Sequence, residues 1–148
     1  MHLNQYKLIS QKSLMIFEFT STGHKGQVNK IIQYTPTELK NIYNLGFGDK
    51  DMKTGLINDL SVTDNGDSQK VLATVAFSIY LFTEAHPDAL VYAVGSTKAR
   101  TRLYRIGITN QWEAIEKDFN VYGLIDGNWK KFKKAITYKA FLVQRKKL

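Results

Sequence analysis

Residues 67–86 read DSQKVLATVAFSIYLFTEAH, and this stretch decides the fold. Its apolar side chains recur at steps of three and four residues, which is the spacing of one face of an α-helix. They are Val71, Leu72, Val75, Ala76, Ile79 and Phe82. Asp67 is a residue type favoured just before the first helical turn, and Pro87 prevents the helix from continuing. The sequence therefore predicts an amphipathic helix of about five turns that lies across a sheet.

The residues before this helix predict a series of strands. Four segments are rich in strand-forming residues or alternate apolar with polar side chains, and turn-forming residues separate them. They are residues 14–19, 27–34, 42–47 and 56–62. Short strands in series are typical of an antiparallel sheet.

Three further strands are predicted after the helix. They are residues 90–94, 121–125 and 138–143. Asp126-Gly127 follows the second of these segments and is a strong signal for a tight hairpin turn. The closing strand leads into a basic tail.

A second helix is predicted between the first two of these later strands. Its apolar face consists of three residues at helical spacing, Ala99, Leu103 and Ile106. Gly107 is expected to end this helix. Asn110 and Glu113 then have the spacing of a capping box, which begins a further helical segment.

These patterns predict one α+β domain over residues 1–148. We expect an antiparallel sheet of four or more strands packed by the long helix, with an additional helix and strands in a basic C-terminal third. The 148 residues are 43% hydrophobic, a composition that supports a core and differs from that of disordered proteins. The chain contains no cysteine, which excludes disulfides, zinc–thiolate centres, iron–sulfur clusters and thiol nucleophiles.

The net charge of +8 is concentrated in the last third of the chain. Residues 1–96 contain 8 Lys and Arg against 9 Asp and Glu, whereas residues 97–148 contain 13 against 4, a net charge of +9. This asymmetry predicts a polyanionic partner, such as nucleic acid or another phosphate-rich ligand. The alternative is a solvated basic surface that only favours solubility.

The ends and the apolar segments of the chain predict a cytoplasmic protein without a membrane partner. The first residues lack the apolar region of a signal peptide, and no apolar run approaches the roughly 20 residues of a membrane-spanning helix. We expect no cofactor, and the sequence leaves homo-oligomerisation open.

The segment at residues 95–105, GSTKARTRLYR, contains the best candidates for ligand binding. A strand, a turn and a helix in this order place backbone N–H groups at residues 96–98 beside the hydroxyls of Ser96 and Thr97, which is the arrangement of an anion site. The candidate anion-binding residues of this segment are Ser96, Thr97, Lys98, Arg100, Arg102, Tyr104 and Arg105.

The charged residues of this segment follow helical spacing. Lys98, Arg102 and Arg105 form one basic stripe, while Arg100 and Tyr104 are four residues apart and bring a guanidinium beside an aromatic ring. The planar guanidinium of arginine suits phosphate better than an ammonium does. The alternative is a set of structural ion pairs with the carboxylates that follow, Glu113, Glu116 and Asp118.

A second basic cluster, WKKFKK, occupies residues 129–134. Aromatic rings interleaved with lysines stack on bases in proteins that bind single-stranded nucleic acid, while the ammonium groups contact phosphates. The candidate residues of this cluster are Trp129, Lys130, Lys131 and Lys133. The alternative is an edge strand protected by lysines, with Trp129 and Phe132 facing inward.

Residues for catalysis are less evident. Five aspartates lie close together in the sequence and would form a Mg²⁺ site if two or three converged, but turns and a helix cap explain most of them better, so we expect no metal. They are Asp49, Asp51, Asp59, Asp64 and Asp67. His24, Lys25 and Arg100 have the chemistry for metal-free RNA cleavage, but no pattern brings them together. The segment at 95–105 also lacks the Walker pattern of a phosphate loop.

Several strings resemble one family of small bacterial proteins with a domain of unknown function. They are GHKG at 23–26, YNLGFGD at 43–49, NGDSQKVLATV at 65–75, GSTKARTRLYR at 95–105 and YKAFLV at 138–143. One departure is His24, where the resemblance implies proline. The order of four strands followed by a helix is also similar, in architecture alone, to the Whirly single-strand-binding folds, and a shared fold does not fix a function.

The sequence favours the binding of nucleic acid, single-stranded in particular, or of another phosphate-rich anion through the basic C-terminal residues and without catalysis. One alternative is a small RNA-cleaving or phosphate-transferring enzyme of a toxin–antitoxin system. Another is a protein-interaction module whose basic surface docks on an acidic partner. Whether the protein is an enzyme stays open at this point.

Overall fold

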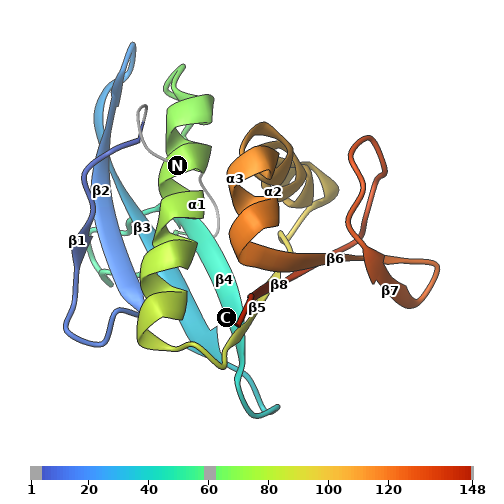
Figure 1. The fold of residues 1–148 in the computed structure, drawn as a ribbon. Coiled ribbons are helices and arrows are strands. Elements are labelled where there is room, and N and C mark those ends of the chain that lie inside the picture. Colours follow the sequence, from blue (N-terminus) through green and yellow to red (C-terminus); the bar gives the residue numbers. More distant parts are fainter. Residues whose placement is uncertain (1–4, 59–62, 148) are drawn as a thin grey trace.

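The computed structural model describes residues 5–58 and 63–147, and within them the chain forms one eight-stranded sheet and three helices (Figure 1). The strand order is β1-β2-β3-β4-β5-β8-β6-β7. The strands are β1 (Ile9–Ser10), β2 (Ile16–Gly23), β3 (Gly26–Pro36), β4 (Ile42–Asp49), β5 (Leu90–Ala93), β6 (Phe119–Ile125), β7 (Asn128–Lys131) and β8 (Phe141–Arg145). The helices are α1 (Ser68–Ala85), α2 (Lys98–Asn110) and α3 (Trp112–Asp118). The predicted α+β class is confirmed.

Helix α1 is the predicted amphipathic helix, and it lies across β2, β3 and β4 (Figure 1). Phe82 is fully buried, and its ring stacks on that of Tyr34 with a centroid distance of 4.1 Å. The Tyr34 hydroxyl lies 2.7 Å from the hydroxyl of Ser78 on the same helix. Burial of such aromatic rings supplies much of the apolar area that stabilises a core.

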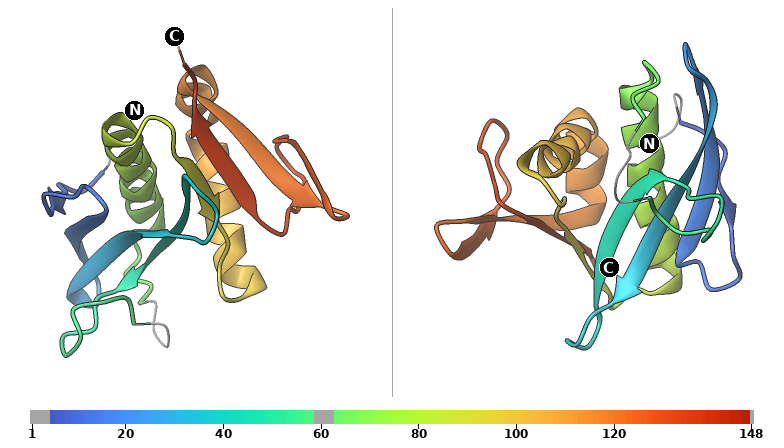
Figure 2. Two further views of the ribbon diagram at one scale, coloured as in Figure 1. Left: turned by 90° about the horizontal axis from the view of Figure 1, so that it is seen from below. Right: turned by 180° about the vertical axis from the view of Figure 1, so that it is seen from behind.

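The register of the sheet separates a covered face from an uncovered one. Tyr34, Leu45, Ala93 and Phe141 are successive partners in β3, β4, β5 and β8, and all four are buried beneath the helices. Because side chains alternate along a strand, the residues between them point to the opposite face. Seen from below, β8 and β6 lie in front of α2 and α3, with no element over them (Figure 2, left).

Strands β4 and β5 form the parallel pair of the described sheet, and α1 connects them. Every other pairing in the described sheet is antiparallel, so the predicted antiparallel sheet is confirmed in its main part. The parallel pair is short, from Ile42 opposite Leu90 to Leu45 opposite Ala93. Beyond Leu45, β4 continues beside β3 while the chain after β5 turns away, and the two strands separate.

Three local predictions about helix ends were wrong. Helix α2 continues through Gly107 to Asn110, because Gly107 faces Leu72 of α1 where the two helices approach each other. Asp67 precedes α1, but its carboxylate does not cap the helix and instead accepts hydrogen bonds from the hydroxyls of Tyr6 and Ser21. Asn110 lies inside α2, so the predicted capping box with Glu113 does not form.

The predicted strand at 56–62 is also not observed in its described part. Residues 56–58 contain only an isolated bridge between Ile57 and Lys50, and residues 59–62 lie outside the described residues. The predicted turn at Asp126-Gly127 is confirmed, with φ of 51° and 74° between β6 and β7. The closing strand starts at Phe141 instead of residue 138, since the buried Tyr138 packs its ring against Gly123 before the strand begins.

Candidate functional site

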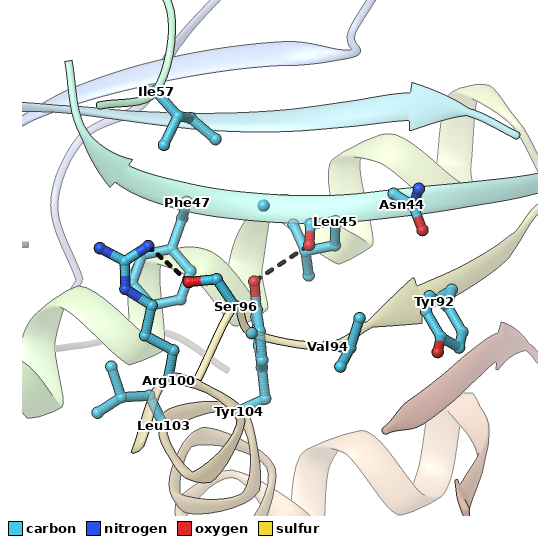
Figure 3. A pocket seen from close by; sticks show the side chains of 12 residues that line it. Asn44, Leu45, Phe47, Ile57, Tyr92, Val94, Ser96, Arg100, Leu103 and Tyr104 are labelled. Carbon is cyan, nitrogen blue, oxygen red and sulfur yellow. Dashed lines mark hydrogen bonds between the residues drawn. The ribbon is translucent and has the colours of Figure 1, made fainter. Parts of the chain in front are cut away.

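A hollow of about 460 Å³ lies where β4 and β5 separate (Figure 3). One wall is the second half of β4, the opposite wall is the end of β5, and the start of α2 closes one end. The side chains that carry its chemistry are Asn44, Phe47, Tyr92, Ser96, Arg100 and Tyr104. Its volume is in the range of pockets that hold small molecules.

The start of α2 is held tightly against the end of β5. The Thr97 hydroxyl accepts a hydrogen bond of 3.2 Å from the Arg100 backbone N–H, which makes Thr97 the N-cap. The Gly95 backbone N–H donates to the Thr101 hydroxyl at 2.9 Å. A Cβ atom at Gly95 would lie 2.4 Å from the Arg100 Cβ, so this close approach requires glycine. Thr97, predicted to bind an anion, thus serves the helix itself.

Arg100 extends from this helix start into the hollow. Its Nη1 donates to the Ser96 hydroxyl at 3.2 Å, so two predicted site residues are in contact (Figure 3). Among the residues that the structure describes, no carboxylate forms an ion pair with Arg100. Arg100 is half-buried, which reduces the solvent screening of its charge. The guanidinium is therefore well placed to attract an anion.

The alternative prediction for the cations of α2, structural ion pairs with the carboxylates that follow, is not observed in the described part of the chain. Lys98 and Arg102 are exposed and Arg105 is partly exposed, and none of the three pairs with a carboxylate there. The described ion pairs of this protein involve other residues: Lys30 with Asp49, Lys50 with Glu18 and Lys147 with Asp88. The carboxylate of Asp118 instead accepts from the Tyr80 hydroxyl.

Tyr104, a candidate residue for anion binding, is buried and forms a wall of the hollow. It is 8% exposed, its hydroxyl donates to the Leu45 carbonyl at 3.1 Å, and its ring meets that of Phe47 edge-on. Burial raises the pKa of the Tyr104 hydroxyl well above its usual value, an effect that the nearby Arg100 charge partly opposes. Tyr104 therefore anchors α2 to β4 and forms part of the wall of the hollow.

The two aromatic residues of 129–134 differ in burial, so the edge-strand alternative, which expects both to face inward, holds for one of them. Phe132 is buried and lies 4.8 Å from the Trp112 ring, as the edge-strand alternative requires. Trp129 is 41% exposed on β7, the last strand of the sheet. The lysines of this cluster are exposed, and none of them pairs with a carboxylate of the described residues: Lys130, Lys131, Lys133 and Lys134.

The uncovered sheet face joins the hollow to Trp129. Residues from five neighbouring strands are successive partners across it: Asn44, Tyr92, Leu142, Tyr122 and Lys131. Tyr92 lines the hollow together with Arg100, and its ring also lies edge-on to Trp129 at a centroid distance of 6.1 Å. Tyr92 thus lies between the two basic segments, residues 95–105 and residues 129–134.

Tyr92, Tyr122 and Asn44 were not among the predicted site residues. In residues 90–94, Tyr92 has the opposite parity to Val91 and Ala93, and this alternation indicates that it faces away from the core. The apolar character of that run hid the alternation. The neighbourhood of Tyr92 and Tyr122 depends on the strand order, which the sequence does not reveal.

A second hollow of about 280 Å³ shares Phe47, Arg100 and Leu103 with the first. At its base lies Lys30, which is 2% exposed and pairs with Asp49. Burial raises the pKa of the Asp49 carboxyl, but hydrogen bonds from Lys30 and Thr63 outweigh it, and the pKa is lower than its usual value. The opposite charges of Lys30 and Asp49 neutralise each other. Arg100 is then the cation that the two hollows share.

The aspartates do not gather into a metal site in the described part of the chain. Asp51 and Asp64 accept backbone N–H groups within their own turns, as the sequence predicted for most of them. No group of three or more His, Asp or Glu side chains suited to a metal ion occurs among residues 5–58 and 63–147. Asp59 lies outside the described residues.

Comparison with known proteins identifies the family. A family model described as a family of unknown function, DUF6934, matches residues 2–146. The chain belongs to this family. No curated protein and no solved structure matches the chain, so the expected likeness to Whirly folds is not supported. No helix in the described residues is long and apolar enough to cross a membrane.

Three of the five strings that carried the resemblance to this family line the two hollows: 43–49, 65–75 and 95–105. The turn at Gly23 packs against Asn65, whose side-chain oxygen accepts the Lys25 N–H at 2.7 Å. The string at 43–49 forms the β4 wall, and the string at 95–105 provides the opposite one. These segments are far apart in the sequence, and the fold brings them to one end of the molecule.

Proposed function

We propose that this protein binds single-stranded nucleic acid across the uncovered face of β5, β8, β6 and β7. The observation that carries the proposal is the row of side chains on this face, in which Tyr92, Tyr122 and Lys131 are aligned across the strands with Trp129 beside them. Exposed rings beside cations are the features by which sheet surfaces bind single strands.

Stacking explains why a single strand fits better than a duplex. The bases of a single strand are free to lie on the rings of Tyr92, Tyr122 and Trp129, whereas those of a duplex are stacked on one another. No helix of the described residues protrudes from this face to enter a groove (Figure 2). The phosphates then lie near the exposed ammonium group of Lys131, which has no carboxylate partner among the described residues.

The proposal is tested by fluorescence anisotropy with a labelled single-stranded oligonucleotide. We expect Trp129→Ala and Tyr122→Ala each to weaken binding by about 1–3 kcal/mol, the usual contribution of one stacked base. Ile9→Ala is the matched control, because Ile9 is a 70% exposed apolar residue in β1 at the opposite edge of the sheet. Ile9→Ala should leave the affinity unchanged.

Two results would contradict the proposal. One is the absence of binding to single strands at low salt. The other is an equal loss of affinity in Trp129→Ala and Ile9→Ala. An acidic protein that copurifies in place of nucleic acid, with a ratio of absorbance at 260 and 280 nm typical of protein, would favour the docking of an acidic partner instead.

A further inference from the structure

The hollow between β4 and β5 differs from the flat face beside it, because it has a charged end, an apolar middle and a polar far end. Arg100 and Ser96 lie at one end and Asn44 at the other (Figure 3). Tyr92 belongs both to the hollow and to the uncovered face, so a nucleic-acid strand bound on that face would lead into the hollow.

We propose that this hollow binds one phosphorylated nucleotide, with its phosphate on Arg100 and Ser96 and its base against the aromatic wall that Phe47 and Tyr104 form together. The inference rests on the proposed function, since it assigns the hollow to the end of a bound strand. A free nucleotide has the same chemistry, and the experiment below separates the two sources.

The charged end has free hydrogen-bonding capacity for a phosphate. A guanidinium has five N–H donors, and within the described residues Arg100 uses one of them, on the Ser96 hydroxyl. The others form a planar fork suited to two phosphate oxygens. The Ser96 hydroxyl accepts from Arg100 and retains its own proton to donate. A half-buried guanidinium without a carboxylate partner among these residues gains from such an anion.

The middle of the hollow offers rings and apolar side chains to a flat base. Val94 and Leu103 contribute apolar surface, and Phe47 and Tyr104 contribute aromatic rings. The Tyr104 hydroxyl already donates to the Leu45 carbonyl, so it does not compete for the ligand. Stacking and apolar contact of this kind tolerate any base.

Asn44 provides the polar group at the far end. Its side chain is exposed, and it forms no hydrogen bond with another described residue. A carboxamide carries both a donor and an acceptor, which match the polar edge of a base. The order phosphate site, ring site and amide follows the order of groups in a nucleotide.

The experiment compares short labelled oligonucleotides of one sequence with a 5′-phosphate, a 3′-phosphate or hydroxyls at both ends, together with free AMP as a competitor. We expect one terminal phosphate to tighten binding roughly ten- to a hundredfold, the effect of a hydrogen-bonded charge. Arg100→Gln should abolish this gain and Ser96→Ala should reduce it. Lys117→Gln is the charge-matched control, since this exposed lysine of the neighbouring helix α3 does not line the hollow. Thermal melts followed by circular dichroism confirm that each variant folds.

The outcomes distinguish this inference from the proposed function. Oligonucleotide binding that ignores both terminal phosphates and AMP would overturn the nucleotide site and leave the binding face intact. Equal losses in Arg100→Gln and Lys117→Gln would overturn it as well. Binding of AMP that requires Arg100, with no gain in affinity for the longer oligonucleotide, would support the nucleotide site and contradict the binding face.

Discussion

Lys30 is buried in β3 opposite Asp49 of β4, and the two form an ion pair under the N-terminal end of α1. Lys30→Met should lower the free energy of unfolding by about 3–5 kcal/mol, because it removes the positive charge that offsets a buried carboxylate. Lys50→Met is the control, since Lys50 pairs with Glu18 at a more exposed position and its loss should cost less than about 1 kcal/mol. Unfolding in guanidinium chloride measures both free energies. Similar losses of stability in the two variants would contradict the larger contribution of the buried ion pair.

The Asp49 carboxyl also predicts how stability depends on pH. Its pKa is lower in the folded protein than in the unfolded chain, so its stabilising contribution is complete above the unfolded value near 3.8 and is lost as the pH falls through the lower folded value. Asp49→Asn should therefore flatten the loss of stability in acid. Asp126→Asn, at an exposed turn, should keep the wild-type acid dependence. Denaturant unfolding at pH 7 and pH 3 measures how much stability each variant loses in acid. Equal losses in the two variants would contradict the role of Asp49 in this pH dependence.

Two glycines of the α2 segment should respond in opposite directions to alanine. Gly107 lies inside the helix with Leu72 at 3.4 Å from an added Cβ, an ordinary contact, so Gly107→Ala should stabilise the protein by about 1 kcal/mol through helix propensity. An added Cβ at Gly95 would lie 2.5 Å from the Thr101 backbone nitrogen, so Gly95→Ala should destabilise it by about 1–3 kcal/mol. Melting temperatures measure both changes. A lower melting temperature for Gly107→Ala would show that α1 and α2 are packed too closely for a methyl group.

The elements that the sequence predicts well are those with local causes. Helix α1 was predictable because its apolar period and Pro87 act within one segment, and the β6–β7 turn because Asp126-Gly127 favours positive φ. The end of α2 was not predictable in this way, because the contact of Gly107 with Leu72 joins residues that are far apart in the sequence. The cap at Asp67 failed for a similar reason, since distant hydroxyls occupy its carboxylate.

The candidate site was predictable only in part, because it depends on the strand order of the whole molecule. Arg100 and Ser96 were both predicted site residues, but their hydrogen bond was not predicted, because the sequence paired Arg100 with Tyr104. The hollow exists because β4 and β5 pair in parallel and then separate, and the aromatic row exists because β8 lies between β5 and β6. Neither pairing has a signature in the local sequence.

The charge asymmetry of the whole molecule leads to a prediction about salt. Each phosphate that a lysine contacts on a single strand adds about 0.7 to the slope of log affinity against log salt concentration. Lys131→Gln should therefore flatten the slope by about 0.7. The control is Lys12→Gln, which removes the same charge from an exposed position at the other edge of the sheet. Trp129→Ala should lower the affinity at every salt concentration without changing the slope, because stacking releases no counterions. If Lys12→Gln flattens the slope as much as Lys131→Gln does, the nucleic acid responds to the net charge of the protein and does not bind at the uncovered face.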